Sequence, residues 1–260
     1  MSDRLQAILE HKRREVEVSR EQHPLAELKS KIPGTDPVRS FPGALRSPGN
    51  RVIAEIKRAS PSKGVIAREF DHRQLASEFE QGGACALSVL TDERYFQGDP
   101  RFIRDVKAVS SLPVLRKDFI LDEYQVYESR VLGADAILLI VRALEEQTLG
   151  NLLSCASEIG LGVLVEVHDA GDLECVNRLR PDVVGVNNRD LSDFSVSLDR
   201  STELRAKIKG DCVTVSESGI ATRNDIERLK KAGFDAFLVG EALMTSTDRI
   251  KTLLSLTQEQ

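Results

Sequence analysis

Short apolar runs recur along the chain from Asn50 onward, and each has the length of a strand. The runs are rich in β-branched residues and are apolar almost continuously, which is typical of strands covered on both faces in a parallel sheet. Successive runs begin roughly 20 to 35 residues apart, enough for a strand, a helix and two loops. They cover residues 52–56, 86–90, 113–117, 136–141, 162–167, 183–187, 212–216 and 236–240.

The segments between these runs have the apolar spacing and end signals of helices. Residues 222–234 are an example, with Thr222 or Asn224 near the start and Gly233 at the end. Eight strand–helix units in a chain of 260 residues predict an α/β fold of the (β/α)8 TIM-barrel type. A doubly wound sheet is the alternative.

The N-terminal part of the chain has a different pattern. Residues 4–22 predict an amphipathic helix and residues 23–33 a second, short helix. Residues 34–50 are rich in glycine and proline and predict a loop. We therefore expect residues 1–48 to form an N-terminal helical extension capping the barrel, and residues 49–260 to form the (β/α)8 catalytic domain.

Composition narrows the range of partners. Hydrophobic residues make up 41% of the chain and charged residues 30%, as in soluble globular proteins. The net charge is −5 and no long basic run offsets it, which argues against nucleic-acid binding. The apolar runs are too short to cross a bilayer, and the N-terminus lacks the apolar block of a signal peptide. We expect a cytoplasmic monomer that acts on a small molecule.

Cysteine and histidine give no sign of a cofactor. The four cysteines form no C-x-x-C pair and are expected to be small buried thiols in a reducing compartment. The four histidines lack metal-ligand spacing. There is no dinucleotide fingerprint and no Walker loop. We expect neither a metal nor an organic cofactor.

Charged and polar residues collect where the predicted strands end. The active site of such a barrel lies at the carboxyl ends of its strands. One charge there is most often a solvated rim residue or half of a structural ion pair. A mixed set around one mouth can instead hold pKa values shifted for acid–base chemistry. The set comprises Glu55, Lys57, Lys117, Glu166, Asn187, Arg189, Glu217 and Ser218.

Two glycines and a serine indicate a phosphate site. Gly219 and Gly240 follow the last two predicted strands, where barrels of this class commonly bind phosphate. Ser60 lies in the polar loop "ASPSKG" after the first strand. A glycine after a strand is often only a turn residue, but two at these positions favour phosphate binding.

Two aromatic residues follow the second and third predicted strands. Phe96 and Phe119 could line a pocket for a flat apolar group, or they could pack the loops. For either phenylalanine taken alone, the sequence does not favour one of these two roles over the other.

Several blocks of the sequence resemble one family. "IAEIKRASPSKG", "LSVLTDERYFQG", "LPVLRKDFI", "GADAILLIV", "LVEVHD", "GVNNRDL", "VSESGI" and "LVGEALM" resemble, in this order, the strand-end blocks of indole-3-glycerol phosphate synthase. The resemblance covers nearly the whole chain. It implies a carboxy-lyase of tryptophan biosynthesis. The substrate would be 1-(2-carboxyphenylamino)-1-deoxyribulose 5-phosphate, and an indole ring would close with loss of CO2 and water.

The resemblance also implies roles for the residues at the strand ends. Lys117 would be the general acid at the ketone oxygen, and Glu166 the general base when hydroxyl and proton are lost. Lys57 would be either an acid at dehydration or a carboxylate binder, oriented by Glu55. The other positions would hold substrate hydroxyl or carboxylate (Asn187, Arg189), complete the polar ring (Glu217, Ser218), line the ring pocket (Phe96, Phe119) and bind phosphate (Ser60, Gly219, Gly240).

The alternatives to this activity are two other enzymes and a barrel without activity. An aldolase-type barrel would use Lys117 or Lys57 as a Schiff-base nucleophile. A catalytically inactive barrel would only bind a phosphorylated metabolite, although the full set of acids and bases argues against it. The related phosphoribosylanthranilate isomerase would need a Cys/Asp pair, which has no counterpart where "AEIK" stands.

Overall fold

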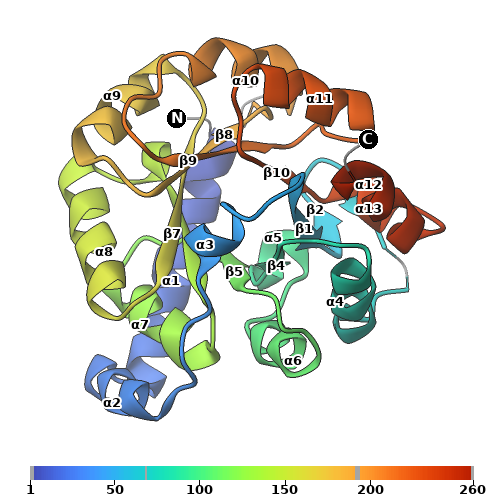
Figure 1. The fold of residues 1–260 in the computed structure, drawn as a ribbon. Helices are drawn as coiled ribbons and strands as arrows, with labels where there is room; N and C mark the ends of the chain where they lie inside the picture. Colours follow the sequence, from blue (N-terminus) through green and yellow to red (C-terminus); the bar gives the residue numbers. More distant parts are fainter. Residues whose placement is uncertain (1–2, 68, 191–193, 259–260) are drawn as a thin grey trace.

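Eight parallel strands close into a barrel in the order β1-β10-β9-β8-β7-β6-β5-β4 (Figure 1). The computed structural model describes residues 3–67, 69–190 and 194–258. This closure confirms the predicted (β/α)8 fold and rules out the doubly wound sheet. Each predicted strand lies within one residue of an observed one. The strands are β1 Arg51–Ile56, β4 Ala86–Leu90, β5 Val114–Lys117, β6 Ala136–Ile140, β7 Gly162–Val167, β8 Val183–Asn187, β9 Val213–Glu217 and β10 Ala236–Val239.

A ring of helices covers the outer face of the barrel. Capping side chains begin several of them. Thr222, one of the two residues predicted near the start of α11, forms a capping box with Asp225 there. A two-strand hairpin, β2 Ala59–Ser60 with β3 Gly64–Val65, follows β1. The helices after the strands are α4 His72–Gln81, α5 Glu93–Phe96, α6 Arg101–Val109, α7 Glu123–Leu132, η2 Val141–Ala143, α8 Glu146–Glu158, α9 Ala170–Leu179, α10 Leu198–Arg205, α11 Arg223–Lys231, α12 Glu241–Met244 and α13 Arg249–Thr257.

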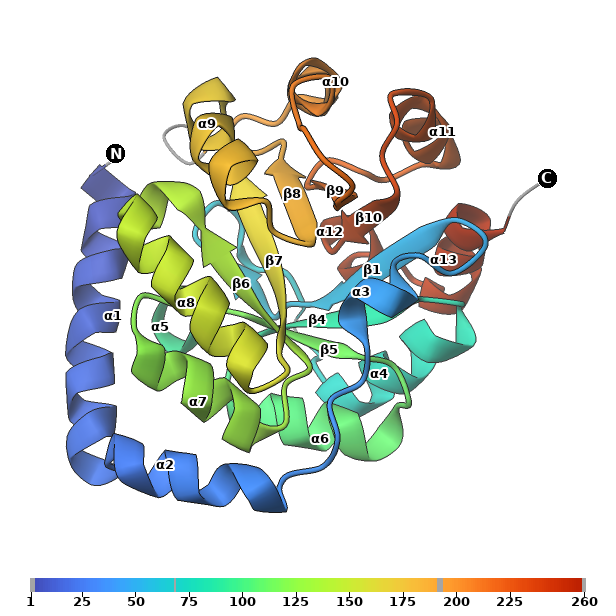
Figure 2. The same cartoon turned by 60° about the vertical axis from the view of Figure 1, so that its left-hand side comes forward.

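The N-terminal segment reaches both ends of the barrel. It contains α1 Asp3–Gln22, α2 Leu25–Lys31, η1 Ile32–Gly34 and α3 Phe41–Ala44. In Figure 1, α3 lies in front of the barrel and α1 crosses behind it, and Figure 2 shows α1 and α2 along one side. Helices α1 and α3 contribute buried side chains to the cluster of inward-facing barrel residues. These are Leu5 and Leu9 from α1, and Phe41 at the start of α3.

The prediction of a loop over residues 34–50 is wrong where α3 forms. Ser40 accepts a hydrogen bond from the Gly43 amide at 3.1 Å and so caps one turn of helix. Phe41 is fully buried against the amino ends of the strands, close to Gly162 at the start of β7. Burial of this one ring stabilises a turn that composition alone describes as loop.

Two compositional expectations can be compared with the structure. All four cysteines are free. The expected burial is confirmed for Cys155 and Cys175, whereas Cys85 and Cys212 are only partly buried. Within the described ranges, no helix combines the length and apolar character needed to cross a membrane.

Candidate active site

A pocket of about 720 Å³ opens at the carboxyl ends of the strands. Its size suits a metabolite-sized ligand. Arg4, Leu5 and Ile8 of α1 cover part of the mouth. Every predicted site residue lines the pocket, although the roles assigned to them stay predictions: Glu55, Lys57, Ser60, Phe96, Lys117, Phe119, Glu166, Asn187, Arg189, Glu217, Ser218, Gly219 and Gly240.

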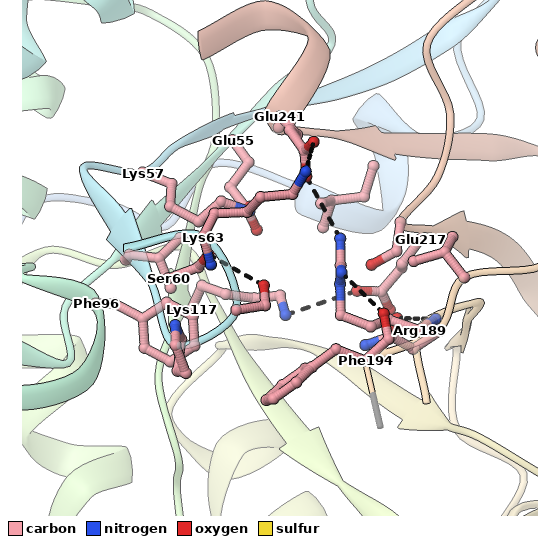
Figure 3. Close-up of a pocket in the computed structure, with 18 of the residues that line it drawn as sticks. Glu55, Lys57, Ser60, Lys63, Phe96, Lys117, Arg189, Phe194, Glu217 and Glu241 are labelled. Carbon is pink, nitrogen blue, oxygen red and sulfur yellow. Dashed lines mark hydrogen bonds and ion pairs between the residues drawn. The ribbon is translucent and has the colours of Figure 1, made fainter. Parts of the chain in front are cut away.

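Lys117, the last residue of β5, lies among carboxylates at the centre of the pocket (Figure 3). Its Nζ is 3.3 Å from Glu166 Oε2 and 3.7 Å from Glu217 Oε2. Burial alone would lower the pKa of Lys117, but Glu166, Glu217 and Glu55 outweigh it and raise the pKa. The ammonium therefore stays charged at neutral pH.

Glu55 and Lys57 form an ion pair at the end of β1, with 2.5 Å between Oε1 and Nζ. Side chains two residues apart on a strand point to the same face, and here that face is the barrel interior. Burial alone would raise the pKa of Glu55, but Lys57 and Lys117 reverse the direction and lower it. The end of β1 therefore contributes one negative and one positive side chain to the wall of the pocket.

Glu166 and Glu217 are buried on neighbouring parts of the mouth, and their surroundings push their pKa values apart. Burial would raise the pKa of Glu166, but Lys117 and His168 lower it to about 2. His168 Nε2 lies 3.2 Å from Glu166 Oε1. Burial and the Glu166 charge together raise the pKa of Glu217 well above its ordinary value. The surroundings thus favour the ionised form of Glu166 and the protonated form of Glu217, the usual sign of an acid–base pair.

The raised pKa of Glu217 predicts a pH-dependent gain in stability on removing its charge. The folded pKa exceeds that of the unfolded chain, roughly 4.3. The wild-type protein therefore loses stability as pH rises above that value, because the unfolded chain ionises first. Glu217→Gln should raise the free energy of unfolding in urea by an amount that is small at pH 4 and grows towards pH 7. Exposed Glu158→Gln on α8 is the control. A gain independent of pH would contradict the assignment.

Two glycines make room for these carboxylates. A Cβ atom at Gly185, on β8, would overlap Glu217 Oε1. A Cβ atom at Gly240, after β10, would lie 2.5 Å from Glu55 Oε1. Gly240, predicted to contact phosphate through its backbone, therefore also leaves space for the buried carboxylate of Glu55. No local sequence pattern reveals this second constraint.

Gly240→Ala is therefore expected to change kcat as well as KM. The new methyl group would push Glu55 away from Lys57, so kcat should fall about tenfold or more, a loss of transition-state stabilisation as well as of binding. Gly34→Ala is the control, since a Cβ atom there meets nothing within 4 Å. Steady-state kinetics measure kcat and KM separately. A raised KM with unchanged kcat would mean that this glycine serves phosphate binding alone.

The turn after β9 has an unusual backbone. Ser218 and Gly219 both have left-handed conformations, with φ of 69° and 77°. A side chain at Gly219 would collide with Val196. Asn188 Nδ2 donates to the Ser218 carbonyl at 3.1 Å and holds the turn in place. Non-glycine residues in this conformation are strained and concentrate at functional sites. The pattern at the strand ends did not single out Asn188.

Two cations at the edge of the pocket share one carboxylate. Lys63 Nζ lies 3.3 Å from Glu241 Oε1, and Arg189 Nη2 lies 3.5 Å from Glu241 Oε2 (Figure 3). Lys63 belongs to the turn between β2 and β3, inside the "ASPSKG" loop. Sequence reasoning chose Ser60 from that loop and missed Lys63, although the loop itself was the signal.

The opposite side of the pocket is apolar. The rings of Phe96 and Phe119 lie with centroids 6.2 Å apart. Leu5 and Ile8 of α1 line the same pocket, and the Arg4 guanidinium lies 4.7 Å from the centroid of the Phe194 ring. The amphipathic pattern predicts the helix but does not show which end of the barrel it covers.

In the part of the chain that the structure describes, no group of three or more His, Cys, Asp and Glu side chains has the arrangement of a metal site.

Two solved structures share the fold at low sequence identity. A 3-hexulose-6-phosphate synthase matches with a TM-score of 0.63 and 16% identity, over 79% of this chain and 97% of that one. An orotidine 5'-phosphate decarboxylase from Pyrococcus horikoshii matches with a TM-score of 0.58 and 13% identity, over 78% of this chain and 95% of that one. At this identity the likeness shows the fold alone.

Sequence relatives are far more similar. The sequence model of the family described as "Indole-3-glycerol phosphate synthase" matches residues 5–256. The indole-3-glycerol phosphate synthase of Chlorobium phaeovibrioides is 51% identical over 94% of this chain and 95% of its own length. The indole-3-glycerol phosphate synthase of Aromatoleum aromaticum is 44% identical over 98% of this chain and 99% of its own length. The chain therefore belongs to the indole-3-glycerol phosphate synthase family.

Proposed function

We propose that this pocket converts 1-(2-carboxyphenylamino)-1-deoxyribulose 5-phosphate to indole-3-glycerol phosphate, with release of CO2 and water. The observation that carries the proposal is the charge pattern around Lys117. A charged ammonium lies 3.3 Å from an ionised carboxylate, Glu166, and 3.7 Å from Glu217, whose raised pKa favours the protonated form. Ring closure and dehydration need an acid, a base and a cation in this way.

The phosphate is proposed to bind at the side of the pocket formed by Ser60, Gly219 and Gly240. Supporting this, the turn at Gly219 and the start of α12 after Gly240 place backbone N–H groups at the pocket, an arrangement that suits anions. Lys63 and Arg189 add positive charge there. An incoming phosphate would compete with Glu241 for both cations.

The benzoate ring is proposed to lie against Phe96 and Phe119, under the apolar side chains of α1. A flat ring packs favourably against aromatic side chains. Its carboxylate would then face the cations of the pocket, of which Lys57 and Lys117 are the most buried. This placement puts the ketone between the ring end and the phosphate end, next to Lys117.

The chemistry follows from these positions. The ring carbon bearing the carboxylate bonds to the ketone carbon, and Lys117 donates its proton to the ketone oxygen. Loss of CO2 leaves its electron pair to restore the aromatic ring. The new hydroxyl then takes a proton from Lys57 and leaves as water, while Glu166 removes the proton from the neighbouring carbon and so completes the indole. Glu217, whose raised pKa favours the protonated form, lies near enough to Lys117 to return a proton to it.

The extension, residues 1–48, is proposed to cap the barrel and to close the pocket through α1, with residues 49–260 as the catalytic domain. We also propose that the enzyme acts as a monomer in the cytoplasm. In support, the exposed large hydrophobic residues among those described are isolated valines on different elements: Val18, Val65, Val109 and Val196. Sedimentation at micromolar concentration tests the oligomeric state.

Incubation with the substrate, followed by borohydride, tests the proposal against the Schiff-base alternative. The proposed mechanism predicts indole fluorescence and no stable adduct after borohydride treatment. A covalent adduct at Lys117 or Lys57 would favour an aldolase-type reaction. Tight substrate binding without any product would favour a barrel that only binds a metabolite.

A further inference from the structure

Lys12 is a fully buried lysine in the middle of the apolar face of α1. It lies one turn after Leu9 and one turn before Val16, both of which are buried. A lysine at such a position is costly unless its charge is paired. The mechanism above does not use it.

The ammonium of Lys12 meets two aspartates that belong to the barrel. Its Nζ lies 2.9 Å from Asp118 Oδ1 and 3.2 Å from Asp92 Oδ2, and 2.8 Å from Glu15 Oε1 within the same helix. Both aspartate side chains are almost fully buried. Burial would raise the pKa of Asp118, but Lys12 and Arg116 lower it to about 2. The ion pair of Lys12 with Asp118 is therefore charged throughout the working pH range.

Each aspartate shapes a segment that carries a pocket residue. Asp92 caps α5, accepting a hydrogen bond from the Tyr95 amide at 2.7 Å, and α5 ends in Phe96. Asp118 follows Lys117 directly and accepts a hydrogen bond from the Phe119 amide at 2.8 Å. Its other oxygen accepts hydrogen bonds from Thr91 Oγ1 at 2.6 Å and Arg116 Nη2 at 3.2 Å.

The same helix forms part of the pocket wall. Leu5 and Ile8 lie one to two turns before Lys12 on the buried face of α1 and line the pocket. Apolar contacts alone would allow a helix to slide or rotate over a mouth. A buried charge with fixed partners accepts only one register, as buried polar groups do in helix pairs.

We propose that Lys12 is a positioning residue for the apolar end of the pocket. By fixing the register of α1 on the segments after β4 and β5, its ammonium places Phe96, Phe119 and the α1 side chains around the benzoate ring. The inference rests on the proposed function, because the ring belongs to the proposed substrate.

Lys12→Met in the full-length chain is the test, with Lys29→Met as the matched control. Lys29 also joins the N-terminal segment to the barrel, 3.0 Å from Glu123, but in an exposed pair. Kinetics are measured at a temperature where circular dichroism shows both variants folded. Lys12→Met should raise KM at least tenfold and change kcat less than about threefold, because binding is lost in ground and transition states alike. Lys29→Met should match the wild type.

Two competitive inhibitors separate positioning from a general loss of structure. Lys12→Met should weaken inhibition by N-methylanthranilate, a probe of the ring end, at least fivefold. Inhibition by inorganic phosphate should stay within about twofold of the wild type. Equal weakening of both inhibitors, or a folded variant with wild-type KM, would overturn the proposal. Absence of turnover in the wild type would instead reject the proposed function.

A second variant keeps the test decisive if Lys12→Met does not fold. Lys12→Met combined with Asp92→Asn removes the unpaired buried charge, and asparagine still caps a helix well. The double variant should show the same selective loss of ring-end binding. Wild-type values for KM and for both inhibitors in this folded variant would contradict the role of Lys12.

Discussion

Lys117→Ala is expected to lower kcat by about 10²–10⁴-fold, the usual range for losing a positioned acid. The ammonium lies between Glu166 and Glu217 at the centre of the pocket, and alanine leaves no proton donor at that position. KM should change much less, because the phosphate and ring contacts remain. Initial rates followed by indole fluorescence measure both constants.

Two further variants make this prediction specific. Lys117→Arg should not restore activity, because a guanidinium holds its proton too tightly to donate it. Lys31→Ala, at an exposed lysine of α2, should match the wild type. Near-normal kcat in Lys117→Ala, or full activity in Lys117→Arg, would mean that Lys117 is not the proton donor.

Glu166→Gln is expected to reduce overall kcat by a similar factor, about 10²–10⁴-fold. Its effect should fall on the second half of the reaction, because the amide cannot remove the proton that completes the indole. Ring closure and decarboxylation need Lys117 and should continue. A decarboxylated, still hydroxylated intermediate should therefore accumulate and be detectable by mass spectrometry in quenched samples.

The pH profile gives a separate check on Glu166. Its pKa of about 2 keeps it ionised above roughly pH 4, so its protonation should not limit the wild-type rate there. The amide variant should be impaired by the same factor from pH 5 to pH 8. A defect that disappears at either end of this range, or normal release of product, would argue against Glu166 as the base.

The barrel and the positions of its polar residues could be predicted because they depend on local pattern. The apolar runs mark the strands to within one residue, and the polar residues chosen at the ends of these runs line the pocket. Glu55 and Lys57 illustrate this: their spacing alone places both on one face. Lys117 and Glu166 are found in the same way, and closure of the barrel brings them together.

What could not be predicted depends on contacts between distant segments. Lys12 looks like one of several charged residues in α1, and only its burial against Asp92 and Asp118 distinguishes it. The opposite pKa shifts of Glu166 and Glu217 arise from which neighbours each one meets, not from residue type. Gly240 likewise must lack a side chain because a Cβ atom there would meet Glu55, a residue on another strand.

The charged mouth of this barrel is proposed to close an indole ring with loss of one CO2 and one water. A single-turnover reaction with 1-(2-carboxyphenylamino)-1-deoxyribulose 5-phosphate, with enzyme in excess, is the decisive measurement. Indole fluorescence and one equivalent of CO2 per substrate are expected, with both lost in Lys117→Ala. Bound substrate recovered unchanged from the wild-type enzyme, or a product that keeps its carboxylate, would contradict it.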